Sequence, residues 1–340
     1  MAKNEPTINR RGFLKKAIGA TVAAALGIVA LLSFKKTAIV KQPSSDLDRL
    51  NKIEPSLIQY KQCAEPIATG LSESRAIAVD SAGLIHVAGD KTVRLFNQSG
   101  DLLKETTLGD MPRALFLTDQ GLLYIAMTDH IRILNKQYKQ IANWKSLGQR
   151  SHLTSIAVSK DHVFIADAGN RIVVHCDLRG KILNYIGKKD KDRNIPGFVV
   201  PSPYFDLAVA PDGLLRVANP GRHRIEAYTF DGDFEFAWGK ATFRIEGFCG
   251  CCNPVSFAIL PDESFVTCEK GLLRVKVYDP DGTFKAVVAG PDQLAEGRTC
   301  RVCTSPAKCG TGGFGVTTDG KGRIFVLDTV KNLVRIFAKT

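Results

Sequence analysis

The chain has 340 residues, 44% of them hydrophobic, which is long enough for one large domain with a well-buried core. Its formal net charge of +12 is uneven: residues 1–41 hold eight Lys or Arg and one Glu, giving +7, and the other 299 residues carry +5. A basic tail beside a mildly basic domain indicates targeting and argues against nucleic-acid binding. No basic stripe interleaved with aromatic residues and no recognition-helix pattern accompanies it.

The N-terminal segment resembles a twin-arginine export signal, carried by Asn9-Arg10-Arg11-Gly12-Phe13-Leu14-Lys15. The uncharged run Ala17–Phe34 follows, and as a helix its eighteen residues would extend about 27 Å, near the thickness of a bilayer core. No clean small-x-small cleavage site follows it. We therefore expect an uncleaved inner-membrane anchor over residues 1–40, with its basic end in the cytoplasm and a linker over 41–56. The alternative is an ordinary signal that is cut at an atypical site.

The rest of the chain is organised in repeats. Between Ile156 and Lys181, short runs rich in β-branched residues end at Asp, Gly or Asn, which is typical of strands closed by turns. One register recurs at spacings of 38, 40, 52, 49 and 60 residues, in Val87-Ala88, Ile125-Ala126, Ile165-Ala166, Val217-Ala218, Val266-Thr267 and Val326-Leu327. A period near forty residues with four strands in each unit predicts propeller blades.

Two stretches, Asp167-Ala-Gly-Asn170-Arg171-Ile172 and Asn219-Pro-Gly-Arg-His-Arg224-Ile225, resemble the NHL-repeat family over roughly residues 73–340. The resemblance implies an all-β, six-bladed propeller and is weak evidence for function. The last repeat offers only three strands, Gly315–Thr318, Arg323–Leu327 and Val334–Ala338. The spare segment Leu57–Gln62 is expected to pair antiparallel with Val334–Ala338 and close the ring, so the propeller is expected to span residues 57–340.

Three insertions interrupt the later repeats, over Lys188–Tyr204, Ala241–Val255 and Gln293–Gly313. Each joins the outer strand of one blade to the inner strand of the next. In a propeller of alternating strands these connections emerge on one face, together with the loops between second and third strands. Long loops without structure of their own are often functional, so we expect this face to carry the binding elements.

Seven of the nine cysteines fall on this face by the same argument: Cys249, Cys251, Cys252, Cys268, Cys300, Cys303 and Cys309. Cys268 is interpreted as the last residue of its strand, in register with Asp167, Asn219 and Asp328. The seven thiols are expected to form disulfides, to bind an iron–sulfur cluster or another metal such as zinc, or to remain reactive, and their spacing does not separate these readings. Of the other two, Cys176 is expected to be buried and Cys63 is unassigned.

The loop Gly247–Pro254, with its Gly-Cys-Cys-Asn-Pro core, resembles a subgroup of exported bacterial NHL proteins with no securely attached activity. NHL-like propellers also include a zinc-dependent lyase and lactonase-like hydrolases, which need His or carboxylate ligands at the channel. His130 and His223, with His152, are candidates for such a set, and Arg171 and Arg222 mark the same face. No His-x-His or His-Glu spacing supports them, and Asp167 and Asp328 are interpreted as turn caps.

The sequence thus favours a membrane-tethered, periplasm-facing propeller that binds a protein or small molecule through a cysteine-rich face and is not an enzyme. One alternative is an electron-transfer protein with a cysteine-ligated cluster. The other is a metal-dependent lyase or lactonase-like hydrolase.

Overall fold

The computed structural model describes residues 50, 52–295 and 312–340, all of which belong to one compact unit, Pro43–Thr340. The expected export signal with Arg10 and Arg11, the expected anchor Ala17–Phe34, and Cys300, Cys303 and Cys309 lie outside the described residues. Within the described ranges, no helix combines the length and the hydropathy that a membrane crossing requires.

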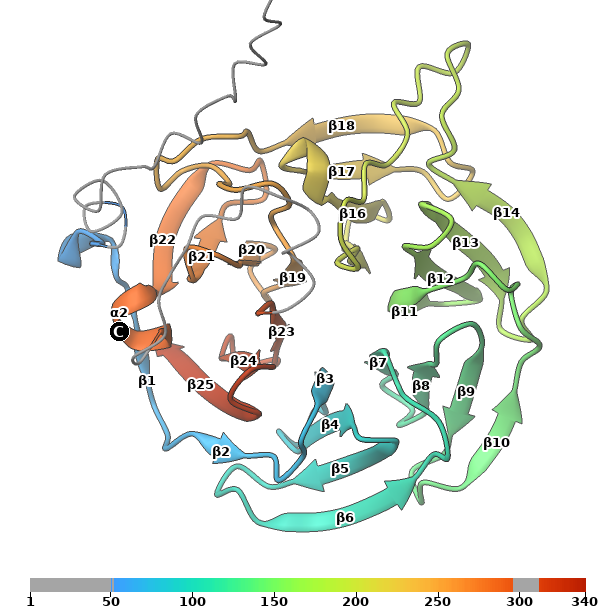
Figure 1. Ribbon diagram of the computed structural model, residues 1–340, viewed down its shortest axis with the longest axis horizontal. Coiled ribbons are helices and arrows are strands. Elements are labelled where there is room, and N and C mark those ends of the chain that lie inside the picture. The colour runs from blue at the N-terminus through green and yellow to red at the C-terminus, as the bar shows by residue number, and fades with distance from the viewer. Residues whose placement is uncertain (1–49, 51, 296–311) are drawn as a thin grey trace, which may run out of the picture. The chain divides into compact units, whose positions relative to one another are not determined.

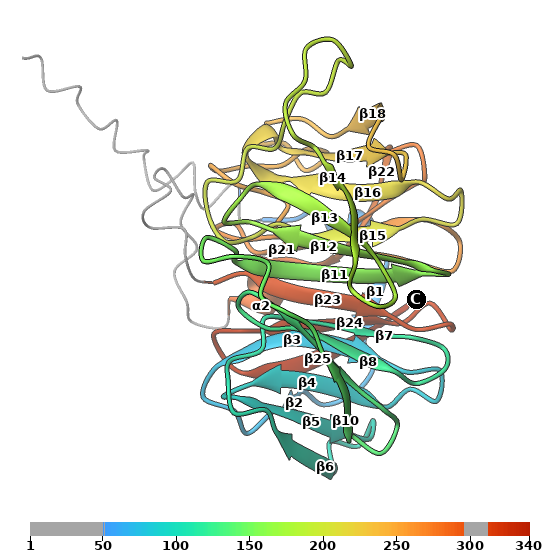
Figure 2. The same ribbon diagram turned by 90° about the vertical axis from the view of Figure 1, so that its right-hand side faces the viewer.

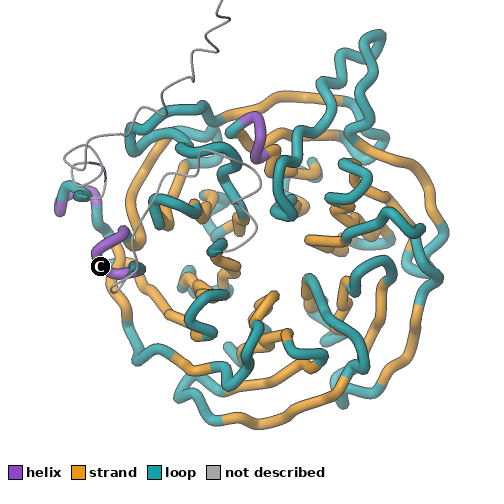
Figure 3. The backbone as a smooth tube through the Cα atoms, in the orientation of Figure 1, coloured by secondary structure: helices purple, strands orange, loops and turns teal. Residues whose placement is uncertain are grey.

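The described residues form a six-bladed β-propeller. Six antiparallel sheets stand around a central channel, and each blade runs from an inner strand at the channel to an outer strand at the rim (Figure 1). Strands and their turns make up nearly the whole ring (Figure 3). Blade one holds β3 (Ser74–Val79), β4 (Ile85–Gly89), β5 (Thr92–Phe96) and β6 (Leu102–Thr107). Blade two holds β7 (Ala114–Leu117), β8 (Leu123–Ala126), β9 (Ile131–Leu134) and β10 (Gln140–Asn143), and blade three holds β11 (Leu153–Ser159), β12 (His162–Asp167), β13 (Ile172–Asp177) and β14 (Ile182–Ile186). Blade four holds β15 (Leu207–Val209), β16 (Leu215–Asn219), β17 (Arg224–Tyr228) and β18 (Phe234–Trp238), and blade five holds β19 (Ser256–Ile259), β20 (Phe265–Glu269), β21 (Arg274–Tyr278) and β22 (Phe284–Ala289).

The sixth blade closes the ring with strands from both ends of the described chain. It holds β23 (Phe314–Thr318), β24 (Ile324–Asp328) and β25 (Leu333–Lys339), and β1 (Tyr60–Gln62) pairs antiparallel with β25. Residues Pro55–Leu57 form a short 3-10 turn, so the closing strand begins later than Leu57. A second short strand, β2 (Ile67–Ala68), was not expected; it pairs with Leu333 and Val334 at the other end of β25.

The apolar pattern explains how the blades pack. The second strand of several blades, such as β4, β16 and β20, is buried along its whole length, because both of its faces meet neighbouring blades. The outermost strand β6 alternates exposed and half-buried residues instead. Core clusters therefore join adjacent blades: one joins blades three and four and contains Phe164 and Tyr228.

The three strands expected in the last repeat agree with the observed ones to within one residue, whereas the closing strand begins three residues later than expected, at Tyr60. The register expected for blade five was wrong by one residue. Glu269, not Cys268, ends its strand in line with Asp167, Asn219 and Asp328, since Glu269 pairs with Arg274 as Asn219 pairs with Arg224. Cys268 pairs with Val275 inside the sheet and takes the place that Ala218 holds in blade four.

The connection between β14 and β15 projects beyond the outer edge of the ring in both orthogonal views (Figures 1 and 2). A bridge between Asp190 and Ile195 holds this part of the insertion together. This part of Lys188–Tyr204 therefore extends away from the ring and does not lie over the channel. The last residues of the insertion return to the channel, where Tyr204 lines the wall.

Candidate functional site

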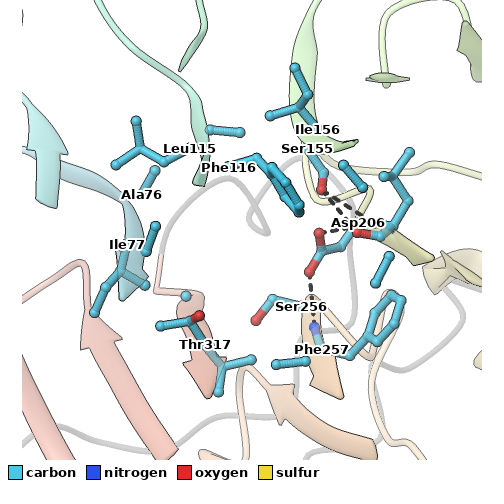
Figure 4. A pocket seen from close by; sticks show the side chains of 18 of the residues that line it. Ala76, Ile77, Leu115, Phe116, Ser155, Ile156, Asp206, Ser256, Phe257 and Thr317 are labelled. Carbon is cyan, nitrogen blue, oxygen red and sulfur yellow. Dashed lines mark hydrogen bonds between the residues drawn. The ribbon is translucent and has the colours of Figure 1, made fainter. Parts of the chain in front are cut away.

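A central channel of about 1630 Å³ runs through the ring. Its wall is made by the first strand of every blade, so all six repeats contribute to it (Figure 4). The side chains along it are mostly apolar or small, such as Ile77, Leu115 and Ile156. A concave space with a few convergent polar groups is the usual form of a ligand site.

Asp206 is a carboxylate residue in this wall, and its side chain lies among those of Ser155, Ser256 and Phe257 (Figure 4). It accepts hydrogen bonds from Leu207 N and, across the blade boundary, from Phe257 N, both at 2.9 Å. Burial raises the pKa of Asp206 to about 6, against the lowering effect of its hydrogen bonds with Ser155, Phe257 and Leu207. Two further hydrogen bonds join neighbouring blades: the Thr154 hydroxyl donates to Phe205 O, and the Ser256 hydroxyl donates to Phe314 O. Asp206 is therefore one of a series of contacts between blades.

The cysteine loop, residues 247–254, lies between β18 and β19 and is fixed by hydrogen bonds to blades four and five. Cys249 N donates to Glu269 Oε2 at 3.0 Å. Asn253 Nδ2 donates to Cys249 O at 2.6 Å, and Lys270 N donates to Asn253 Oδ1 at 3.0 Å. His223 Nε2 lies 2.7 Å from Gly250 O. In blades four and five, the loops between the second and third strands therefore lie against the connection between these two blades.

At the tip of this loop two thiols lie beside a lysine. Cys251 Sγ and Cys252 Sγ are 3.2 Å apart; Cys252 is buried and Cys251 half-buried. Lys270 Nζ lies 3.2 Å from Ser202 Oγ and 4.1 Å from the centre of the Tyr204 ring. Burial lowers the pKa of Lys270, while a hydrogen bond with Cys252 and the proximity of Cys251 act to raise it. Burial, followed by the contact with Cys252, raises the pKa of Cys251 to about 11. We call Ser202, Tyr204, Cys251, Cys252 and Lys270 the thiol cluster.

The cysteine loop rests on a buried ion pair. Lys276 Nζ lies 2.8 Å from Glu269 Oε1, and both side chains are fully buried. Lys276 also donates to Gly247 O at 2.6 Å and to Ile245 O at 3.0 Å. Burial lowers the pKa of Lys276, opposed by the Glu269 carboxylate. Because the pair binds the backbone at both ends of the segment 245–249, it fixes the base of the cysteine loop.

Blade four holds a related network at the equivalent positions. There Asn219 Nδ2 donates to Glu226 Oε1 at 3.0 Å, and Tyr228 OH donates to Glu226 Oε2 at 2.7 Å. Glu226 is fully buried and lies 2.6 Å from Arg224. The carboxylate is thus on the third strand in blade four and on the second strand in blade five, where Lys276 stands in place of Glu226.

The structure separates the described cysteines into groups. Cys249 and Cys268 are buried in one core cluster, and burial raises the pKa of each thiol to about 12. Cys176 is buried, as expected, and Cys63 is exposed beside the closing strand. Within the described ranges no disulfide joins any two of the six cysteines, and no group of three or more His, Cys, Asp or Glu side chains there could hold a metal ion.

The histidine and arginine candidates do not converge. His130 Nδ1 lies 2.8 Å from Asp129 Oδ1 in blade two, and Arg222 donates to Pro196 O at 3.0 Å in blade four. Arg171 is exposed at a left-handed position in blade three. Of the set, His223 alone contacts the cysteine loop, within the described residues. Asp167 and Asp328 accept backbone N–H groups, such as those of His152 and Val330, which supports their interpretation as caps.

Sequence reasoning missed Lys270, Tyr204 and Ser202. Their grouping depends on the connection between blades three and four meeting the loop between the second and third strands of blade five. Lys270 directly follows Glu269, the observed end of β20, so the correct register would have placed Lys270 at the start of the loop.

Comparisons with known proteins support the fold alone. No protein-family model and no curated protein matches the chain. Among solved structures, a streptogramin B lyase is 12% identical, covering 84% of this chain and all of that one, with a TM-score of 0.53. Virginiamycin B lyase from Staphylococcus aureus is 12% identical, covering 83% of this chain and 99% of that one, with a TM-score of 0.54. A Bacteroides thetaiotaomicron protein of unknown function is 14% identical, covering 82% of this chain and 75% of that one, with a TM-score of 0.57.

Proposed function

We propose that the protein is an NHL-type binding propeller, tethered to the membrane by its N-terminal segment and facing the extracytoplasmic space. It engages a protein or small-molecule partner at the channel mouth that carries the cysteine loop. The thiol cluster is the observation that carries this proposal.

The thiol cluster is costly to build. An ammonium group taken out of water loses several kcal/mol of solvation unless neighbours replace it, on the order of the penalty for other buried ions. Lys270 is 4% exposed and lies against the Tyr204 ring and the Cys252 thiol. Such a constellation at the end of a large channel indicates a binding site.

Photo-crosslinking in intact cells tests the proposal. A photoactivatable residue at Val330, which lines this mouth and is 47% exposed, should give a defined crosslinked product. The matched control places the photoactivatable residue at Leu178, which is 40% exposed in the turn between β13 and β14, and should give no crosslinked product. The product should weaken when Cys251 and Cys252 are both replaced by Ala. Equal products from both positions, or none from Val330, would contradict a partner at this mouth.

A second function, electron transfer or metal binding through the cysteines, has one specific observation in its favour. Gly313 N donates to the Tyr204 hydroxyl at 3.1 Å, and Ala295 packs in the same core cluster as Cys249. The residues that flank segment 296–311, with Cys300, Cys303 and Cys309, therefore contact the surroundings of the cysteine loop on both sides. We propose that these thiols complete a ligand set with Cys251 and Cys252.

Anaerobic purification of the full chain tests the metal candidate. Stoichiometric iron with visible absorption, or stoichiometric zinc, should be present and should be lost in the Cys251→Ala/Cys252→Ala variant. Cys63→Ala is the control, because Cys63 lies beside the closing strand. Protein free of metal when purified anaerobically from metal-replete cells would reject this candidate and leave the binding proposal standing.

A further inference from the structure

A second polar group lies at the same mouth of the channel and contains no cysteine. Arg75, Arg113 and His152 come from blades one, two and three, and all three line the channel. Blades one, two and three are consecutive around the ring (Figure 1). The three basic side chains are therefore supplied by three neighbouring repeats.

Local structure directs these side chains. Ala76 pairs with Ala88 in blade one and Ala114 pairs with Ala126 in blade two, so Arg75 and Arg113 precede equivalent residues. The β3–β4 register shifts between Ser74 and Ala76, which leaves Arg75 in a bulge. Bulges re-aim a side chain and are common beside functional sites.

His152 is fixed by its backbone. Its N–H donates to Asp167 Oδ1 at 3.0 Å, and its carbonyl accepts from Ala168 N at 2.9 Å. These bonds fix the backbone of His152 directly before β11, where the residue lines the channel.

The charges of the group are only partly compensated. Arg75 pairs with Glu73. Arg113 is half-buried, and within the described ranges its guanidinium has neither a hydrogen bond nor an ion pair. Burial, followed by Arg75, lowers the pKa of Arg113, while Glu73 and Asp110 act to raise it from a distance. Burial, followed by Arg113 and Arg75, lowers the pKa of His152, and Asp167 acts to raise it.

We propose that Arg75, Arg113 and His152 bind an oxyanion, a carboxylate or phosphate group, of a small ligand whose remainder enters the channel. A guanidinium presents a planar fork of N–H donors that matches such a group, and the unused donors of Arg113 would then be satisfied. The apolar wall below, with Ile77 and Leu115, suits the carbon skeleton of an organic anion. This site goes beyond the proposed function, because it uses none of the thiol cluster.

Isothermal titration of the full chain with inorganic phosphate and with succinate tests the site at fixed ionic strength. Arg113→Gln should weaken binding of the preferred probe about tenfold or more, as expected for hydrogen bonds to a charged group. Arg179→Gln makes the same charge change on an exposed residue in the turn between β13 and β14, and should bind as the wild type does. Succinate preferred over phosphate indicates a carboxylate ligand, and the reverse indicates a phosphorylated one.

A second measurement does not depend on the variant. In the wild type, the probe should raise the pKa of the His152 imidazole, observed by NMR, because an anion stabilises its charged form. Equal affinities in both Gln variants, or an unchanged His152 pKa at saturating probe, would overturn the proposal. No saturable binding of either probe at millimolar concentration would also overturn it. None of these outcomes affects the crosslinking test at Val330.

Discussion

Lys276 Nζ lies 2.8 Å from Glu269 Oε1, and both side chains are fully buried. The same two residues bind the backbone of the cysteine loop, Glu269 at Cys249 N and Lys276 at Gly247 O. The stability of blade five and the position of the loop are thus coupled through one ion pair.

Replacing Lys276 by Met should lower the free energy of unfolding by about 3 kcal/mol or more, since it leaves the Glu269 carboxylate buried without its cation. Chemical denaturation measures this loss. Lys285→Met is the matched control in the same blade, because Lys285 pairs with Asp262 and Asp279 at the surface and should cost under about 1 kcal/mol. Equal losses in the two variants would show that the buried pair has no special weight.

Asp206 should make stability depend on pH in an unusual direction. Its folded-state pKa of about 6 lies above the ordinary value of 3.8, so between these values the folded protein holds a proton that the unfolded chain has lost. The free energy of unfolding should therefore fall as pH rises through this window, by at most about 3 kcal/mol, and by less where water in the channel screens the charge.

The Asp206→Asn variant should lack this contribution, so urea denaturation at pH 4.5 and 7.5 should show a smaller fall than in the wild type. Asp262→Asn is the control, because hydrogen bonds and Lys285 lower the pKa of Asp262 below its ordinary value of 3.8. Asp262 is therefore ionised in the folded and the unfolded protein throughout this pH range, and its replacement should leave the wild-type fall unchanged. A variant with Asn at position 206 that keeps the wild-type fall would exclude Asp206 as its source.

Thiol alkylation of the native protein should follow burial and pKa. Cys63 should react first, because it is exposed, and Cys251 should react slowly, because its pKa is raised to about 11. Cys176, Cys249 and Cys268 should stay unmodified until the protein unfolds. Peptide mass spectrometry after a short iodoacetamide pulse measures the order, and early labelling of Cys268 would contradict the buried register assigned to it.

Closure of the ring should depend on the backbone of β1. Cys63 N donates to Ile336 O and Thr340 N donates to Gln59 O, so the alternation of antiparallel bonds makes Lys61 and Ala338 a hydrogen-bonded pair. Lys61→Pro should remove that bond, destabilise the protein by about 1–3 kcal/mol and expose the edge of β25. Urea denaturation and size-exclusion chromatography should show lower stability and association, whereas Lys61→Thr should show neither.

The blade plan could be predicted because the sequence repeats it: short β-branched runs between turns recur in one register, and one strand too few remains at the C-terminal end. The register of blade five could not, because Val266-Thr267 resembles the Val-Ala pairs of other blades closely enough to hide a shift of one residue. Only the pairing of Glu269 with Arg274 reveals it.

The channel mouth was beyond sequence reasoning for a different reason. Arg75 and Arg113 are 38 residues apart in the chain, and their side chains meet the channel only because adjacent blades bring equivalent positions together and a bulge frees one of them. Apolar periodicity records which face of a strand is buried. It does not record which loop residues from different blades become neighbours.

Blades four and five carry different polar pairs at equivalent positions, and this difference affects which strands can pair while the repeats fold. If β17 paired with β20, Glu226 would lie beside Glu269, two carboxylates in a space without water. If β21 paired with β16, Lys276 would lie beside Asn219 and have no buried carboxylate to neutralise it. Each exchange would leave a buried charge uncompensated, whereas the native partners satisfy each other. The two polar pairs thus give adjacent repeats distinct identities, which disfavours strand exchange between them during folding.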